Sequence, residues 1–257
     1  MFMKALQNPL YTPVFTPVFH LAEAKIVGLD VQVRIGQKFL SDIEVFNVLE
    51  SGNEKNLLPQ ISEYLQHWSE MSGERLYLSW SVNSHMDKKR LGIFLEKLAQ
   101  HVPLNQVEMM INMQGINAEG VIPNQTELLE WFQNLGIKRG LSNARPLDFN
   151  LSDLYEFVDV LKIKKGVIRE MQEDTCSASQ CHAVIEKLNA KNIKIVADDL
   201  YSKSDVICAI LMGIKYGQGY FLSRNHSLPK PVRNQKKNQG NPYYDRKIDF
   251  FHDLAWV

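Results

Sequence analysis

The residues of this 257-residue chain that could do chemistry include a set of acids, amides and a lysine that we expect near the ends of strands. They are Asp30, Asn83, Lys162, Asp198 and Gln218. By residue type alone, a polar network satisfied by its own hydrogen bonds explains this set as well as a functional site does. Both interpretations therefore stay open at this point.

Three cysteines and a histidine form a second group with residue types that bind zinc: Cys176, Cys181, His182 and Cys208. The Cys176–Cys181 spacing matches no strong zinc pattern, and Cys208 falls inside a predicted helix, so we expect plain thiols and no cofactor. An odd number of cysteines in a chain of this size is typical of reduced thiols, which favours a cytoplasmic location.

The elements that must position these residues alternate between short β-like segments and longer segments of helical periodicity. The strand candidates are rich in Val, Ile and aromatic residues, as is typical of strands covered on both faces. They span 14–19, 25–35, 76–82, 107–113, 137–141, 158–163, 193–197 and 216–222. Helical spacing of apolar residues predicts helices near 57–68, 91–98, 125–133, 177–190 and 204–212, the last with Ser204 as its N-cap.

Eight strands with helices between most of them predict an α/β fold, a TIM-like (β/α)8 barrel. Only residues 22–24 join the first two strands, which predicts an antiparallel hairpin at the start of the barrel. The length also suits a single barrel of about 250 residues.

The charge balance excludes some partners. The chain holds 29 basic and 29 acidic side chains, so it has no net field that would steer it to nucleic acid or to an anionic membrane. The longest apolar run, 207–214, is far shorter than the roughly 20 residues of a membrane-spanning helix. We therefore expect neither contact with a membrane nor a nucleic-acid partner.

The C-terminal stretch differs in composition from the rest. Residues 225–242 are polar and basic without an acid, which is typical of a solvated linker. Residues 243–257 are rich in aromatic residues and could form a helix with one apolar face. Such a tail either packs on its own barrel or docks on a partner.

Several short motifs occur in the order and spacing of a known family. They are Phe15-Thr16-Pro17-Val18, the segment KIVGLDVQVR at 25–34, VNS at 82–84, VDVLKI at 158–163, IVAD at 195–198 and QGYFLSR at 218–224. Together they resemble the EAL domain, a bacterial phosphodiesterase family that linearises cyclic di-GMP, over residues 12–224. The resemblance implies a barrel whose first strand runs antiparallel.

The family's chemistry uses two divalent metals held mainly by carboxylates. The resemblance matches its signature Glu to Asp30, its Asn ligand to Asn83, its catalytic Lys to Lys162, and later Glu and Gln residues to Asp198 and Gln218. Other metal-ligand positions fall on Met110, Ser142 and Asn143, which are not carboxylates. We therefore predict a degenerate domain that binds no metal and is not an enzyme. Tyr201 stands where the family has a further Glu.

Cyclic di-GMP binding is a separate question from hydrolysis. If the dinucleotide binds, the resemblance implies contacts from Gln32, Arg34, Asn83 and Gln218. The leading hypothesis is a cytoplasmic regulator that contacts an unidentified protein, such as a transcriptional or signalling regulator. The alternatives are a cyclic di-GMP receptor without hydrolysis and a weak cyclic di-GMP phosphodiesterase.

Overall fold

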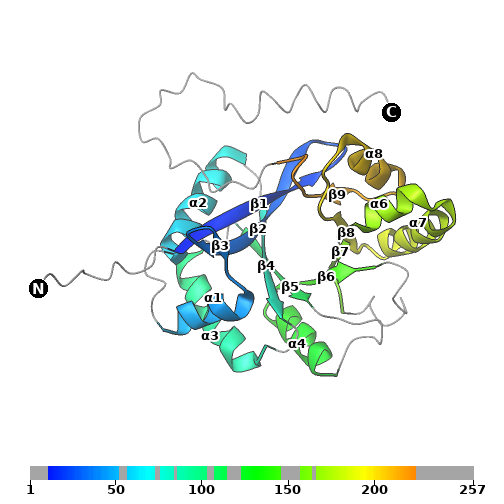
Figure 1. Cartoon of the computed structure of the whole chain (residues 1–257). Helices are drawn as coiled ribbons and strands as arrows, with labels where there is room; N and C mark the ends of the chain where they lie inside the picture. Colours follow the sequence, from blue (N-terminus) through cyan, green and yellow to red (C-terminus); the bar gives the residue numbers. More distant parts are fainter. Residues whose placement is uncertain are drawn as a thin grey trace, which may run out of the picture.

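Eight strands close into a barrel in the order β1-β9-β8-β7-β6-β5-β4-β2, with β2 returning to β1 (Figure 1). The computed structural model describes residues 11–51, 57–72, 76–83, 86–102, 107–114, 123–145, 157–163 and 166–223. The barrel strands are β1 (Tyr11–His20), β2 (Lys25–Ile35), β4 (Leu76–Asn83), β5 (Val107–Gln114), β6 (Lys138–Ala144), β7 (Val160–Ile163), β8 (Lys194–Ala197) and β9 (Tyr216–Gly217). A two-residue strand, β3 (Lys38–Phe39), pairs with the end of β2 outside the ring.

Strand β1 is antiparallel to both of its neighbours, β2 and β9, whereas the other adjacent barrel strands pair in parallel. The turn over residues 21–24 links β1 directly to β2, and Ala24 takes a positive φ of 56° there. The predicted TIM-like α/β barrel with an antiparallel first strand is therefore confirmed.

Seven described helices lie around the outside of the barrel (Figure 1). They are α1 (Asp42–Glu50), α2 (Leu57–Ser72), α3 (Lys88–His101), α4 (Pro123–Asn134), α6 (Val167–Glu173), α7 (Thr175–Ala190) and α8 (Lys203–Leu211). Their apolar faces bury residues such as Phe46 and Phe94 against the outward-facing side chains of the strands, including Trp80. No described helix is long and apolar enough to cross a membrane.

The barrel interior is filled by the other face of the strands. Its apolar layer holds one residue from each of five strands: Val18, Tyr77, Met110, Val160 and Val196. Two glycines make room for large neighbours in this interior. A Cβ on Gly28 would lie 2.4 Å from the ring of Tyr77, and a Cβ on Gly140 would clash with the side-chain amide of Asn112. These glycines are therefore required by packing.

Three local features differ from the sequence prediction. Helices α1 and α6 were not predicted, although Ser41 and Glu44 form a capping box at the start of α1. The N-cap of α8 is Ser202 rather than Ser204, because Ser202 and Asp205 form a capping box. The last strand ends at Gly217, because the chain then turns and bonds to the backbone of Leu200.

Candidate functional site

A cluster of four polar side chains lies where the parallel strands end. Lys162 Nζ of β7 donates a hydrogen bond to Asp30 Oδ2 of β2. Gln218 Nε2, just after β9, donates to Asp30 Oδ2 at 3.1 Å and to Asp198 Oδ1, just after β8, at 2.9 Å. The fold thus brings together four of the five residues that the sequence singled out.

Lys162 is a buried cation within this cluster, with a side chain 7% exposed to solvent. Burial alone lowers the pKa of an ammonium, because it disfavours the charged form. The carboxylates of Asp30 and Asp198 outweigh this effect and hold the pKa of Lys162 above its ordinary value. Lys162 is therefore charged at neutral pH and forms an ion pair with Asp30.

The cluster forms part of the lining of a cavity of about 450 Å³ that opens at the carboxyl ends of the strands. Cavities of this size commonly hold small-molecule ligands. Its described lining carries one ammonium, from Lys162, and four carboxylates, from Asp30, Asp42, Asp198 and Asp199. The described lining is therefore net negative.

The other predicted site residues divide between the cavity and its surroundings. Gln32, Ser142 and Asn143 line the cavity, whereas Arg34 and Asn83 are not among its described lining residues. Ser142 and Asn143 stand where the pairing of β6 with β7 shifts register, and Asn143 has a positive φ of 61°. This irregularity turns both residues toward the cavity.

Met110 lies deeper in the barrel and does not line the described cavity. It is 2% exposed and belongs to the apolar layer that includes Tyr77. In the register of the sheet, Met110 of β5 lies opposite Ser79 of β4, and Ser79 in turn lies opposite Asp30 of β2. Met110 therefore serves as packing in the barrel interior.

The metals that the family implies can be tested against these donors. Within the described ranges, no group of three or more His, Cys, Asp or Glu residues is placed to hold a metal ion. The carboxylate of Asp30 is already bound by the ammonium of Lys162. The donors in the described part of the chain do not fit a centre of two divalent metals.

Two rim residues that motif matching did not assign to the site also line the cavity. Tyr201 follows β8 and Tyr220 follows β9, and their rings are 6.3 Å apart between centroids. The backbone N–H of Leu200 donates to Gln218 O at 3.1 Å, and Phe221 N donates to Leu200 O at 2.9 Å. These backbone hydrogen bonds hold the two loops side by side and so bring the two tyrosines together. The sequence feature that could have identified Tyr201 as a site residue was its position, where the family has a Glu.

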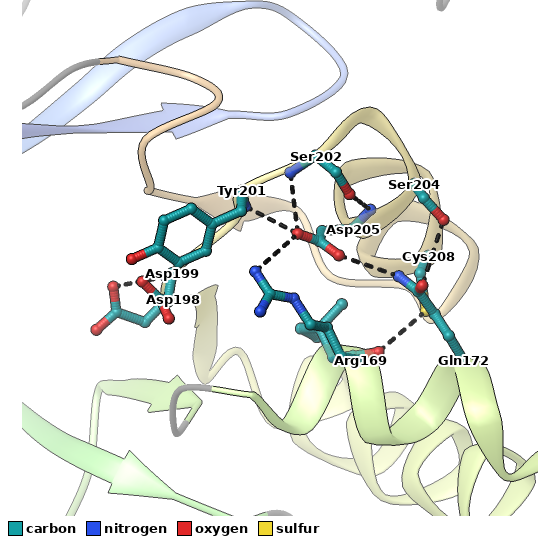
Figure 2. A network of polar contacts seen from close by, with 10 residues as sticks. Arg169, Gln172, Asp198, Asp199, Tyr201, Ser202, Ser204, Asp205 and Cys208 are labelled. Carbon is teal, nitrogen blue, oxygen red and sulfur yellow. Dashed lines mark hydrogen bonds and ion pairs between the residues drawn. The ribbon is translucent and has the colours of Figure 1, made fainter.

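Asp205 fixes the loop that carries Tyr201 (Figure 2). Its Oδ2 accepts hydrogen bonds from the backbone N–H of Tyr201 at 2.8 Å and of Ser202 at 3.0 Å. On the side of α6, Arg169 lies 3.7 Å away and Gln172 donates to Oδ1 at 3.3 Å. Burial raises the pKa of Asp205, but these hydrogen bonds and Arg169 outweigh it and lower the pKa.

The chain is a closed mixed barrel with an antiparallel first strand, and an Asp–Lys–Gln–Asp cluster lines a cavity at the carboxyl ends of its strands. The family model described as "EAL domain" matches residues 1–225, so the chain belongs to the EAL domain family. A comparison with curated protein sequences finds no match.

Solved structures with the same fold include several EAL proteins. PaMucR phosphodiesterase, in a c-di-GMP complex, has 14% identity and a TM-score of 0.63, over 84% of this chain and 91% of that one. An EAL domain protein from Listeria monocytogenes has 18% identity and a TM-score of 0.61, over 85% and 89%. Klebsiella pneumoniae BlrP1, in a calcium and cy-diGMP complex, has 16% identity and a TM-score of 0.62, over 88% and 58%. At these identities the likeness shows the fold.

These comparisons correct one prediction. The prediction that the protein is not an enzyme is wrong, because the chain belongs to the EAL domain family and the solved structures that share its fold include PaMucR phosphodiesterase and the EAL enzyme Bd1971. The prediction counted only carboxylates at matched motif positions. The structure brings two further carboxylates to the cavity, from Asp42 and Asp199, which motif matching did not consider.

Proposed function

We propose that this EAL domain binds cyclic di-GMP in the cavity at the carboxyl ends of its strands. The observation that carries the proposal is the cluster of Asp30, Lys162, Asp198 and Gln218, assembled from distant parts of the chain on the wall of that cavity. Solved structures of the same fold include complexes with this dinucleotide. Ligands of TIM-like barrels bind at this end of the strands.

Buried polar atoms of the cavity lining support a polar ligand. Three of them, Gln218 Oε1, Ser142 Oγ and Asp42 Oδ2, have no hydrogen-bond partner among the described residues. A buried polar atom without a partner is destabilising, so such atoms are normally satisfied by a ligand or by water. In the proposed complex, Gln218 Oε1 accepts from a hydroxyl or an N–H group of the nucleotide, and Ser142 Oγ donates to a phosphate oxygen.

The charge of the described lining opposes binding of the proposed ligand. Cyclic di-GMP is a dianion, and the surplus of carboxylates over Lys162 repels it. Affinity must therefore come from hydrogen bonds and from contacts with the bases. Because salt screens this repulsion, we expect binding to strengthen when the ionic strength rises from low to physiological values.

Equilibrium binding of labelled cyclic di-GMP tests the proposal with a pair of variants. Gln218→Leu removes both the bridging amide and the buried acceptor, so it should weaken binding by roughly tenfold or more. Arg34→Ala, outside the described lining, should bind within about threefold of the unmodified protein. Leu211→Ala is the surface control, because Leu211 is 64% exposed on α8 and does not line the cavity. Equal binding by Gln218→Leu and Leu211→Ala contradicts this site.

A slow cyclic di-GMP phosphodiesterase is the second candidate, favoured by the family and by the retention of Lys162 beside Asp30. Linearisation of cyclic di-GMP that is lost in Asp30→Ala supports it. Regulation through a protein partner, the cytoplasmic location and the division at residues 225–242 and 243–257 stay predictions. The proposed linker and tail lie outside the described residues.

A further inference from the structure

Tyr201 and Tyr220 present two large aromatic faces at the rim of the cavity. The two residues are 46% and 56% exposed, and both line the cavity. Their ring planes are inclined by 27° to each other. Exposed aromatic rings beside a cavity are suited to stacking against a flat, uncharged group.

The two rings are held in place before any ligand binds. Gly219 allows the two loops to approach closely, because a Cβ at this position would lie 2.2 Å from the backbone nitrogen of Leu200. Leu200 itself is fully buried and is bonded to both Gln218 and Phe221. The backbone on either side of the tyrosines is therefore fixed.

Arg169 supports the ring of Tyr201 directly. Its guanidinium carbon lies 4.8 Å from the centroid of that ring, within the range of a cation–π contact. Asp205 holds Arg169 and accepts from the backbone N–H of Tyr201, so one carboxylate orients both partners (Figure 2). A ring that is already ordered loses little freedom on binding.

We propose that Tyr201 and Tyr220 form a stacking platform for one guanine base of the dinucleotide, with Arg169 as a positioning residue. This inference rests on the proposed function. A base is uncharged, so the carboxylates of the cavity do not repel it as they repel the phosphates. The platform thereby supplies affinity at a site whose described charge opposes the ligand.

Fluorescence titration tests the platform, using cyclic di-GMP in which one guanine is replaced by 2-aminopurine. Stacking on a tyrosine should quench the probe on binding to the unmodified protein. Tyr201→Leu and Tyr220→Leu should each weaken binding by roughly 5- to 150-fold and reduce quenching, because loss of one stacking ring removes about 1–3 kcal/mol per base. Tyr201→Phe and Tyr220→Phe keep a flat ring and should bind within about threefold of the unmodified protein.

Arg169→Met is the test of the positioning role. It should reduce quenching less than Tyr201→Leu does, because the ring remains but is less well held. Binding and quenching that are equal in the Leu and Phe variants overturn the platform and leave the proposed function standing. No binding of unlabelled cyclic di-GMP by the unmodified protein overturns both.

Discussion

The ion pair of Lys162 and Asp30 allows a quantitative prediction about stability. In Lys162→Met the carboxylate of Asp30, whose side chain is 13% exposed, loses its counter-ion and keeps Gln218 Nε2 as its donor in the described structure. Leaving one partner of a buried pair uncompensated costs about 3–5 kcal/mol. We therefore expect the free energy of unfolding to fall by that amount. Urea denaturation, with the same slope in both proteins, measures it.

A double variant separates loss of the pair from loss of packing. Lys162→Met combined with Asp30→Asn removes both charges, so it should recover at least half of the stability lost in the single variant. Lys187→Met, at an exposed position in the last turn of α7, is the matched control and should change stability by about 0.5 kcal/mol or less. A cost for Lys162→Met no larger than this control refutes the reasoning.

The same pair has a defined pH dependence. The pKa of Lys162 is raised in the folded protein, so its contribution to stability is fully present below the unfolded pKa of about 10.5. That contribution is lost only as the pH rises through the higher folded value. The stability difference between the unmodified protein and Lys162→Met should therefore be constant from pH 7 to about 10. A difference that shrinks between pH 7 and 9 contradicts a charged, paired Lys162.

Three further predictions concern the loops and charges around the cavity. Asp205→Asn should cost about 2–4 kcal/mol at pH 7, because it weakens two charge-assisted hydrogen bonds. Because the folded pKa of Asp205 is lowered, this difference should begin to shrink as the pH falls below about 4, the pKa of an unfolded Asp, and disappear only below the lower folded pKa, which acid titration of stability checks. Gly219→Ala should lower the melting temperature by several degrees in calorimetry, because its Cβ meets the backbone of Leu200 and φ is 153°, whereas Gly92→Ala should not lower it. Asp42→Asn should strengthen cyclic di-GMP binding by about two- to fivefold at low salt, because it removes one repelling charge from the lining, and no gain would contradict the role assigned to that charge.

Much of the barrel could be predicted because its strands are short runs rich in Val, Ile and aromatic residues, and because only a few residues separate the first two strands. Helix α1 was missed because it is short, although the Ser41–Glu44 capping box that starts it was present in the sequence. Strand β9 was predicted too long because the contact of Gly219 with Leu200 is a tertiary feature. Such contacts have no local signature.

The site could be predicted only in part, because the depth at which a side chain lies inside the barrel depends on the register of its strand. The order of the motifs was sufficient to predict Asp30, Lys162 and Gln218 as site residues, and the structure places all three in one hydrogen-bonded cluster. It did not reveal that Ser79, rather than Asn83, pairs with Asp30, so that Asn83 lies four residues further along β4. Tyr201 and Tyr220 come together at the rim of the cavity because two loops pair through backbone hydrogen bonds. Nothing in the local sequence around either tyrosine predicts that pairing.

Isothermal titration calorimetry of the full chain with cyclic di-GMP tests the central claim most directly. The unmodified protein should show saturable heat with one dinucleotide per chain and micromolar or tighter affinity, and Gln218→Leu should bind at least about tenfold more weakly. Absence of saturable heat at millimolar ligand, or equal heat in Gln218→Leu, contradicts cyclic di-GMP binding in this cavity.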